Sequence, residues 1–294
     1  MSYLFLHCFN TKSLGGLRSE TPKVVWTKDI VPDRCCQFWA PEIHNLDGVW
    51  YILDQSYYTA STDDANQDLN RRMHALKGNS SNIWDSAWSY AGRLAVPNHD
   101  NQWSIDATVM SLSSERYWIY SSKIPGGPQA LWIAKMNGPL SLQKGYEISI
   151  PTNDWEKVNG SVNEGPAPIT HNGRTWIVYS ASHCKGPGYS LASLELAGSD
   201  PLQMSSWKKS NGTIFTSANG NWAPGHNGFF TSPSGDPWML NWHFVRKVYH
   251  AYPVPKVRCD DGRQTLAQPI GFNADGSLDL GEPGPRSEDI PEPK

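Results

Sequence analysis

The sequence predicts an all-β protein, and the spacing of its strands indicates a β-propeller. Helical periodicity is almost absent, and short β-rich runs alternate with clusters of Gly, Pro, Asn, Asp and Ser. One run type, a turn followed by an aromatic–aliphatic strand, recurs around Trp50, Trp118, Trp176 and Trp238, at separations of 68 (118 − 50), 58 (176 − 118) and 62 (238 − 176) residues. A period of about sixty residues with several strands per repeat is typical of a propeller blade.

The recurring strands occupy residues 47–53, 115–120, 173–179 and 235–240. Second strands follow at 131–136 and 189–194, and we expect them to be outer strands of the same blades. The alternative is a β-sandwich whose tryptophan spacing is coincidental. Extending the period backward places another signature roughly ten residues before Met1, so we expect the chain to begin inside its first blade. An unclosed propeller would leave unpaired strand edges.

Composition limits the classes of function. The chain has 294 residues, enough for one large domain, and a formal net charge of −3. There is no basic stripe for nucleic acid and no cationic amphipathic helix for a membrane surface. We therefore expect neither nucleic acid nor a membrane as partner, and we expect a monomer.

The aromatic content points toward carbohydrate. The chain contains 14 Trp and 12 Tyr residues. Most should pack in the core, because large aromatic side chains favour burial. A few could stack on the apolar face of a sugar ring. We select Trp39, Trp103, Trp155 and Trp222 as candidates for that role.

Glu164 is the candidate general acid. It lies in the sequence Val162-Asn163-Glu164-Gly165-Pro166, directly before a strand-like run. A lone carboxylate on a tight Gly-Pro turn is held rigidly and partly away from water, as a proton donor requires. The alternative is a solvated glutamate in a turn.

Three more side chains carry candidate roles. Asp106 lies between apolar neighbours and could perturb the pKa of a nearby acid, or could bond to its own turn. His226 could ligate a metal or orient substrate, although a structural histidine is an equal alternative. Arg263 could clamp a carboxylate or a hydroxyl pair, or be a surface cation.

Glycoside hydrolysis requires two carboxylates, an acid for the leaving oxygen and a base or nucleophile. Glu164 fits the acid, but Asp33 and Asp54 lack a matching context for the base. The five cysteines have no zinc-like spacing. One disulfide is possible, and Cys184–Cys259 is our choice of pair.

Five segments, in the same order, make the sequence resemble glycoside hydrolase family 43, five-bladed propeller enzymes that act on arabinans and xylans. The resemblance extends from about Thr11 to Pro283. The matching segments are Trp39–Ile43, Ser104–Ala107, Val162–Pro166, Gly225–Asn227, and Arg263 with Gln268–Gly276.

The resemblance implies an inverting mechanism. Glu164 matches the proton donor and Asp106 the acid that tunes and orients it. His226 matches a histidine associated with a bound calcium or sodium ion, and Arg263 matches a late active-site arginine. No organic cofactor is implied. The substrate would be an arabinan- or xylan-type saccharide, cleaved by an α-L-arabinofuranosidase or β-xylosidase.

The resemblance also implies a base aspartate upstream of Ser13–Leu17, and we find no match for it within residues 1–10. We therefore expect a five-bladed propeller with an incomplete first blade, with residues 1–10 unmatched, 11–283 forming one catalytic domain and 284–294 a flexible tail. We expect an N-terminally truncated chain with little or no activity. We expect the full-length parent to be extracellular, with any signal peptide carried by the missing upstream segment, since residues 1–9 do not form one.

Two alternatives remain open at this point. A non-catalytic sugar-binding propeller would keep the tryptophans as stacking surfaces and lack the base by design. The second alternative is a transglycosylase or a fructan-type propeller enzyme. Fructan-type enzymes usually work by retention, so the anomer of the product would distinguish them from an inverting glycosidase.

Overall fold

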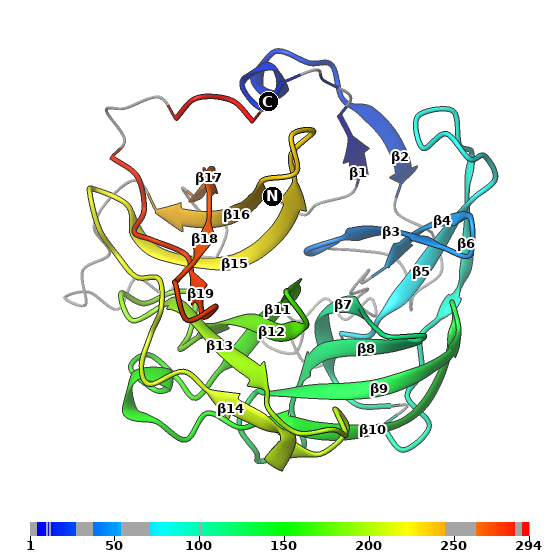
Figure 1. Cartoon of the computed structure of the whole chain (residues 1–294). Coiled ribbons are helices and arrows are strands. Elements are labelled where there is room, and N and C mark those ends of the chain that lie inside the picture. The colour runs from blue at the N-terminus through cyan, green and yellow to red at the C-terminus, as the bar shows by residue number, and fades with distance from the viewer. Residues whose placement is uncertain are drawn as a thin grey trace. The chain divides into compact units, whose positions relative to one another are not determined.

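A computed structural model of the chain describes residues 5–9, 11, 13–27, 38–53, 71–99, 101–244, 263–285 and 290–293. These residues are almost entirely β-strand and turn (Figure 1). The helices within them are short 3-10 turns, namely η1 (Gly15–Arg18), η4 (Asp154–Glu156) and η5 (Met204–Ser206). Within the described part of the chain, no helix has the length and apolar character needed to cross a membrane.

The chain divides into two compact units by its internal contacts. The catalytic domain expected over 11–283 stays a prediction. The first unit comprises residues 1–125 and 133–145, and the second comprises 126–132 and 146–294. Each unit is described by itself below. Each has its own apolar core: Leu6, Phe38, Ile52 and Leu76 cluster in the first, and Val178, Leu191, Phe215, Met239 and Leu280 in the second.

The first unit begins with a strand pair and continues with a four-stranded antiparallel meander. The pair consists of β1 (Phe5–Cys8) and β2 (Lys23–Thr27), so strand structure already occurs before Thr11. The meander runs in the order β3 (Glu42–Leu46), β4 (Val49–Leu53), β5 (His74–Gly78) and β6 (Trp88–Arg93).

A second antiparallel meander follows along the chain. Its strands are β7 (Ser104–Leu112), β8 (Glu115–Ser122), β9 (Ala130–Gly138) and β10 (Ser141–Ser149), and neighbours in sequence are neighbours in the sheet. The boundary between the two units passes through β9 and β10.

The second unit holds two larger sheets and a small hairpin. The first sheet contains β11 (Asn163–His171), β12 (Arg174–Ala181), β13 (Ser190–Leu196) and β14 (Trp207–Lys209). The next sheet contains β15 (Trp222–Thr231), β16 (Pro237–Phe244) and β17 (Arg263–Pro269). The hairpin pairs β18 (Gly271–Phe272) with β19 (Leu278–Asp279).

The predicted repeat is confirmed in the described residues. Each signature tryptophan lies in the second strand of its sheet: Trp50 in β4, Trp118 in β8, Trp176 in β12 and Trp238 in β16. The two following runs are the third strands β9 and β13. Meanders of this kind form propeller blades.

The count of five blades is wrong for the described residues, which form four sheets of blade type. The tryptophan signature occurs four times, once in each of those sheets. The fifth blade came from the family resemblance, and the strands β1 and β2 at the N-terminal end form only a two-stranded pair.

A β-bulge with a left-handed residue marks the beginning of the first strand in three of these sheets. The pairing register shifts next to Asp106 in β7, Gly165 in β11 and His226 in β15, whose φ angles are 53°, 56° and 48°. Ala40, two residues before β3, has a φ of 38°. Bulges bend a strand and redirect a side chain, and they are frequent beside active sites. Asp106, Glu164 and His226, which were selected from the sequence, therefore lie at these bulges.

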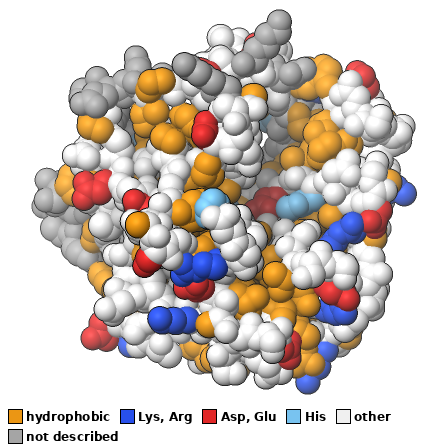
Figure 2. All heavy atoms as spheres, viewed as in Figure 1, with side chains coloured by type: hydrophobic (Ala, Val, Ile, Leu, Met, Phe, Trp, Pro, Cys, Tyr) orange, Lys and Arg blue, Asp and Glu red, His pale blue; other side chains and the backbone are white. Residues whose placement is uncertain are grey.

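On the face of the molecule seen in Figure 2, Lys and Arg side chains are interspersed with Asp and Glu side chains. That face shows no broad area of positive charge, in keeping with the expectation from composition.

Candidate active site

Both carboxyl oxygens of Glu164 are held by neutral donors. The Gln129 amide nitrogen donates to Oε2 at 2.9 Å, and the Tyr189 hydroxyl donates to Oε1 at 3.0 Å. The Glu164 side chain is half-buried at the bulge of β11. Sequence reasoning placed this carboxylate on a Gly-Pro turn before the strand, whereas the structure places it within β11 at a bulge. Neither of its two partners was identified from the sequence.

Gly165 lets the strand carrying Glu164 approach His226 closely. A Cβ atom at Gly165 would lie 3.2 Å from His226 Cα and 3.3 Å from His226 Nδ1. Ser180 adds a second link, because it is paired with Glu164 across β11 and β12, and its hydroxyl accepts a hydrogen bond from the His226 backbone N–H at 2.6 Å. Glu164 and His226 are therefore neighbours within the second unit.

Tyr189 connects the remaining candidates of the second unit. The Arg263 guanidinium lies 5.2 Å from the centroid of the Tyr189 ring, and Trp222 packs against the cluster of Tyr189, Cys184 and Ala223. Gly225 provides the room for this ring, since a Cβ atom there would lie only 2.0 Å from Tyr189 Cε1. Through their contacts with Tyr189 or its cluster, Arg263 and Trp222 are thus connected to Glu164, the general-acid candidate.

Two other tryptophans of the second unit differ in their surroundings. Trp242 of β16 is 40% exposed, and its ring centroid lies 5.8 Å from the Arg263 guanidinium. The sequence analysis did not select it. Trp155, which it did select, is half-buried in η4, next to the buried Glu156.

The other three sequence-selected residues belong to the first unit. Asp106 is 8% exposed at the bulge of β7. Trp103 is 7% exposed, with the Lys123 ammonium 4.3 Å from its ring centroid, an environment that favours packing over sugar contact. Trp39 is half-buried beneath the guanidinium of the buried Arg71.

The described residues near His226 do not form a protein cage for a metal ion. Across the described ranges, no group of three or more His, Cys, Asp or Glu side chains is placed to hold one. Calcium and sodium prefer oxygen ligands, and a lone imidazole is a poor match for them. The ion at His226 stays a prediction, and no chemical step is derived from it.

Some predicted features fall outside the described residues. Asp33 and Asp54, the aspartates weighed as a base, are among them. Cys184 takes part in a disulfide, but Cys259, its expected partner, also lies outside the described ranges.

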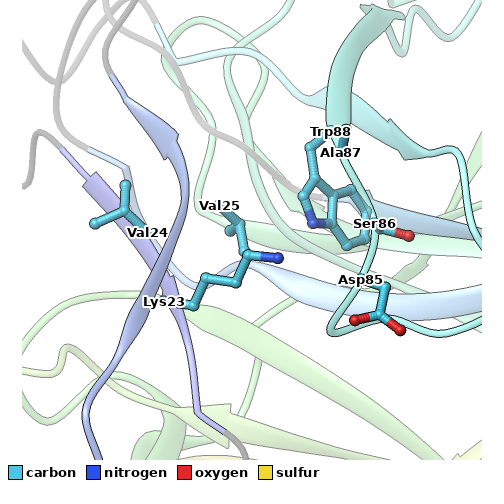
Figure 3. A pocket seen from close by; sticks show the side chains of 7 residues that line it. All are labelled: Lys23, Val24, Val25, Asp85, Ser86, Ala87 and Trp88. Atoms are coloured by element: carbon cyan, nitrogen blue, oxygen red, sulfur yellow. The ribbon is translucent and has the colours of Figure 1, made fainter.

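A pocket in the first unit is lined by two segments of the chain (Figure 3). Lys23, Val24 and Val25 of β2 line one side, and Asp85 to Trp88 line the other. The Lys23 ammonium donates to the Trp84 carbonyl and lies 5.7 Å from the centroid of that indole. None of the sequence-selected site residues lines this pocket, so we assign it no part in catalysis.

Three side chains of this site were missed by sequence reasoning: Gln129, Ser180 and Tyr189. Only Tyr189 had a local signal, because it directly follows Gly186-Pro187-Gly188, a turn that ends where β13 begins. Gln129 and Ser180 are polar residues of ordinary strand sequences, and only their contacts distinguish them.

The chain is similar to known arabinofuranosidases. An extracellular exo-alpha-(1->5)-L-arabinofuranosidase of Streptomyces avermitilis is 34% identical over 92% of this chain and 55% of its own length. Alpha-L-arabinofuranosidase 43 of Humicola insolens is 32% identical over 93% of this chain and 56% of its own length. The chain thus spans about half the length of these curated relatives.

Solved structures support the same grouping. The crystal structure of an alpha-L-arabinofuranosidase from Lactobacillus brevis matches with a TM-score of 0.86 and 28% identity, over 98% of this chain and 89% of that one. The match favours the β-propeller class over the β-sandwich alternative. The family model of glycosyl hydrolases family 43 matches residues 1–278, a range that begins before and ends before our 11–283. The chain therefore belongs to glycosyl hydrolases family 43.

Proposed function

We propose that the protein is a glycosidase that releases α-L-arabinofuranosyl units from arabinan-type saccharides, with Glu164 as general acid. The observation that carries the proposal is the fixed carboxyl group of Glu164, which accepts hydrogen bonds from Gln129 and Tyr189. His226 packs against the adjacent Gly165, and Arg263 faces the Tyr189 ring. The arabinofuranosidase names of the relatives support the choice of sugar, with β-xylosides as the alternative substrate.

In this mechanism, Glu164 transfers its proton to the glycosidic oxygen as the bond to the anomeric carbon breaks. The Gln129 amide and the Tyr189 hydroxyl then stabilise the carboxylate that remains, because both are placed as donors to it. Their fixed positions also limit the rotamers of Glu164, which keeps the proton aimed in one direction.

The other roles are proposals drawn from the family resemblance. Asp106 would tune and orient the acid, and its bulge redirects its carboxylate out of the regular strand alternation. Arg263 would bind substrate oxygens, and Trp222, Trp39 and Trp155 would contact the sugar. Inversion requires a carboxylate base that activates water. We assign no base among the residues that the structure describes.

The proposals on localisation and assembly are supported by fewer observations than the proposed activity. We propose secretion for the parent protein, because relatives from two Streptomyces species are named extracellular. We also propose that the protein acts as a monomer.

The test is hydrolysis of α-1,5-linked arabinobiose, with xylobiose measured in parallel. Glu164→Gln should lower kcat on the preferred substrate by about 10²–10⁴-fold, the usual contribution of a general acid. Glu195→Gln is the matched control, since Glu195 is a partly exposed glutamate of β13 that pairs with Arg174. It should leave the rate unchanged.

Two results would overturn the proposal. Full activity of Glu164→Gln would remove that residue from the chemistry. Binding of arabino-oligosaccharide without any turnover, even after an upstream base aspartate is supplied, would replace the enzyme with the sugar-binding alternative.

A further inference from the structure

A buried carboxylate that the mechanism does not use lies behind the general acid. Glu156 in η4 is 0% exposed. Its oxygens accept hydrogen bonds from the side chains of Lys209, Tyr179, Asn163 and Asn153 and from the backbone N–H groups of Thr152 and Asn153, at 2.7–3.0 Å. These partners satisfy the buried charge, which would be costly to leave unpaired.

The charge of Glu156 is balanced by Lys209 of β14. The Lys209 ammonium lies 2.7 Å from Oε1 and 2.9 Å from Oε2, and it also donates to the Ile150 carbonyl. Burial alone would raise the pKa of Glu156, but the hydrogen bonds from Lys209, Asn153 and Asn163 outweigh it and lower that pKa. A buried ion pair is weak evidence for stability by itself, since apolar residues of similar volume often serve as well. A positional role is the stronger explanation.

Asn163 is the link between this ion pair and the general acid. Its side-chain nitrogen donates to Glu156 Oε1 at 2.9 Å, and its Oδ1 accepts from the Ser149 hydroxyl at 2.8 Å. Its side chain is 0% exposed, so the amide is held from both ends inside the protein. Glu164 is the next residue along the chain.

Gln129 closes the connection on the other side. Its backbone carbonyl accepts from the Asn163 N–H at 2.9 Å, while its side chain donates to Glu164 Oε2 at 2.9 Å. Gln129, which donates a hydrogen bond to the carboxyl group of Glu164, is therefore itself hydrogen-bonded to Asn163. Moving Asn163 would displace both the backbone of Glu164 and the donor that orients its carboxyl group.

We propose that the buried Glu156–Lys209 pair is a positioning device for the general acid, acting through Asn163 and Gln129 to aim the carboxyl group of Glu164. Tyr179 completes the attachment of Glu156 to β12, the strand beside the bulge. None of these residues need touch the substrate. This inference rests on the proposed role of Glu164 as proton donor.

The test compares two substrates that differ in their need for a proton. Arabinobiose must have its leaving oxygen protonated, whereas 2,4-dinitrophenyl α-L-arabinofuranoside loses a stable phenolate without assistance. Asn163→Ala should lower kcat on arabinobiose by about 10–100-fold, because a small misplacement of a catalytic group has effects of that order. On the dinitrophenyl substrate the change should stay within about twofold, because proton donation no longer contributes.

Gln268→Ala is the matched control for losing a buried amide. Gln268 is 5% exposed in the same unit, and its side chain donates to the carbonyls of Leu280 and Glu282. We expect it to destabilise the fold to a similar degree while leaving the ratio of the two rates unchanged. Lys209→Met is a second test variant, and Asn163→Ala carries the test if Lys209→Met does not fold.

The outcomes separate the inference from the proposed function. An equal fall on both substrates in Asn163→Ala would mean that the network is only structural, and the inference would be wrong. Absence of turnover on both substrates, even after an upstream base aspartate is supplied, would instead refute the proposed function. A loss confined to arabinobiose in Glu164→Gln and in Asn163→Ala supports both.

Discussion

At the scale of single residues, Tyr189 makes several distinct contacts in the candidate site. Its hydroxyl donates to Glu164, its ring faces the Arg263 guanidinium, and its edge rests against Gly225. Nothing in its local sequence distinguishes hydrogen bonding to a catalytic acid from ordinary packing. Its importance comes from the strands that surround it.

Tyr189→Phe should lower kcat on arabinobiose by about tenfold, because a neutral hydrogen bond to a developing charge is worth roughly 1–1.5 kcal/mol. KM should change little, because the ring remains to face Arg263. Tyr189→Leu removes the ring as well, and it should raise KM in addition. Steady-state kinetics of both variants measure this difference, and an unchanged kcat for Tyr189→Phe would contradict the role of the hydroxyl.

At the scale of elements, Glu164, the candidate general acid, lies at the bulge at the beginning of β11. Gly165 has a φ of 56°, a conformation that costs other residues about 1–2 kcal/mol. The same glycine is in close contact with His226. The close contact with His226 therefore requires glycine at this position, whereas the left-handed conformation alone does not, because Asp106 and His226 have similar φ angles at their bulges.

Gly165→Ala should lower both stability and activity. Gly173→Ala is the matched control, because Gly173 has a φ of 79° in the turn between β11 and β12, with no atom within 4 Å of an added Cβ. Each variant should lose about 1 kcal/mol of unfolding free energy, since both place a side chain in the left-handed region. Only Gly165→Ala should also lose turnover, by displacing the bulge from His226. Equal activities in the two variants would show that the contact with His226 is dispensable.

At the scale of the whole molecule, Glu156 makes stability depend on pH in the acid range. Although burial opposes it, the hydrogen bonds from Lys209, Asn153 and Asn163 hold the pKa of Glu156 in the folded protein below its ordinary value of 4.5. A lowered carboxylate pKa contributes stability above the unfolded pKa and loses it as pH falls through the folded pKa. The contribution of Glu156 is therefore present at pH 7 and fades below about pH 4.5.

Urea unfolding between pH 7 and pH 3 tests this dependence. The double variant Glu156→Gln with Lys209→Met avoids leaving an unpaired buried charge. Its unfolding free energy should fall less steeply below pH 4.5 than that of the unaltered protein. Asp47→Asn is the control, since Asp47 forms a surface pair with Arg116 that contributes little in water. Parallel pH curves for the double variant and the unaltered protein would contradict the role of Glu156.

Much of the fold could be predicted from the sequence because its signals are local. Strand periodicity and turn residues are readable along the chain, and the four tryptophan signatures each became the second strand of a sheet. The Gly-Pro sequence after Glu164 likewise predicted that the backbone beside this carboxylate is constrained. The fifth blade was not a local signal, and the described residues do not bear it out.

The sequence by itself determined the all-β class, the repeat and the identity of the candidate acid, since each depends on residues within one strand and its turn. Only the tertiary structure decided which side chains hold that acid. Gln129, Tyr189 and Ser180 come from separate segments, and the buried Glu156–Lys209 pair joins η4 to β14 across more than fifty residues. Contacts of this kind depend on how strands pair and sheets pack, which distance along the chain does not reveal.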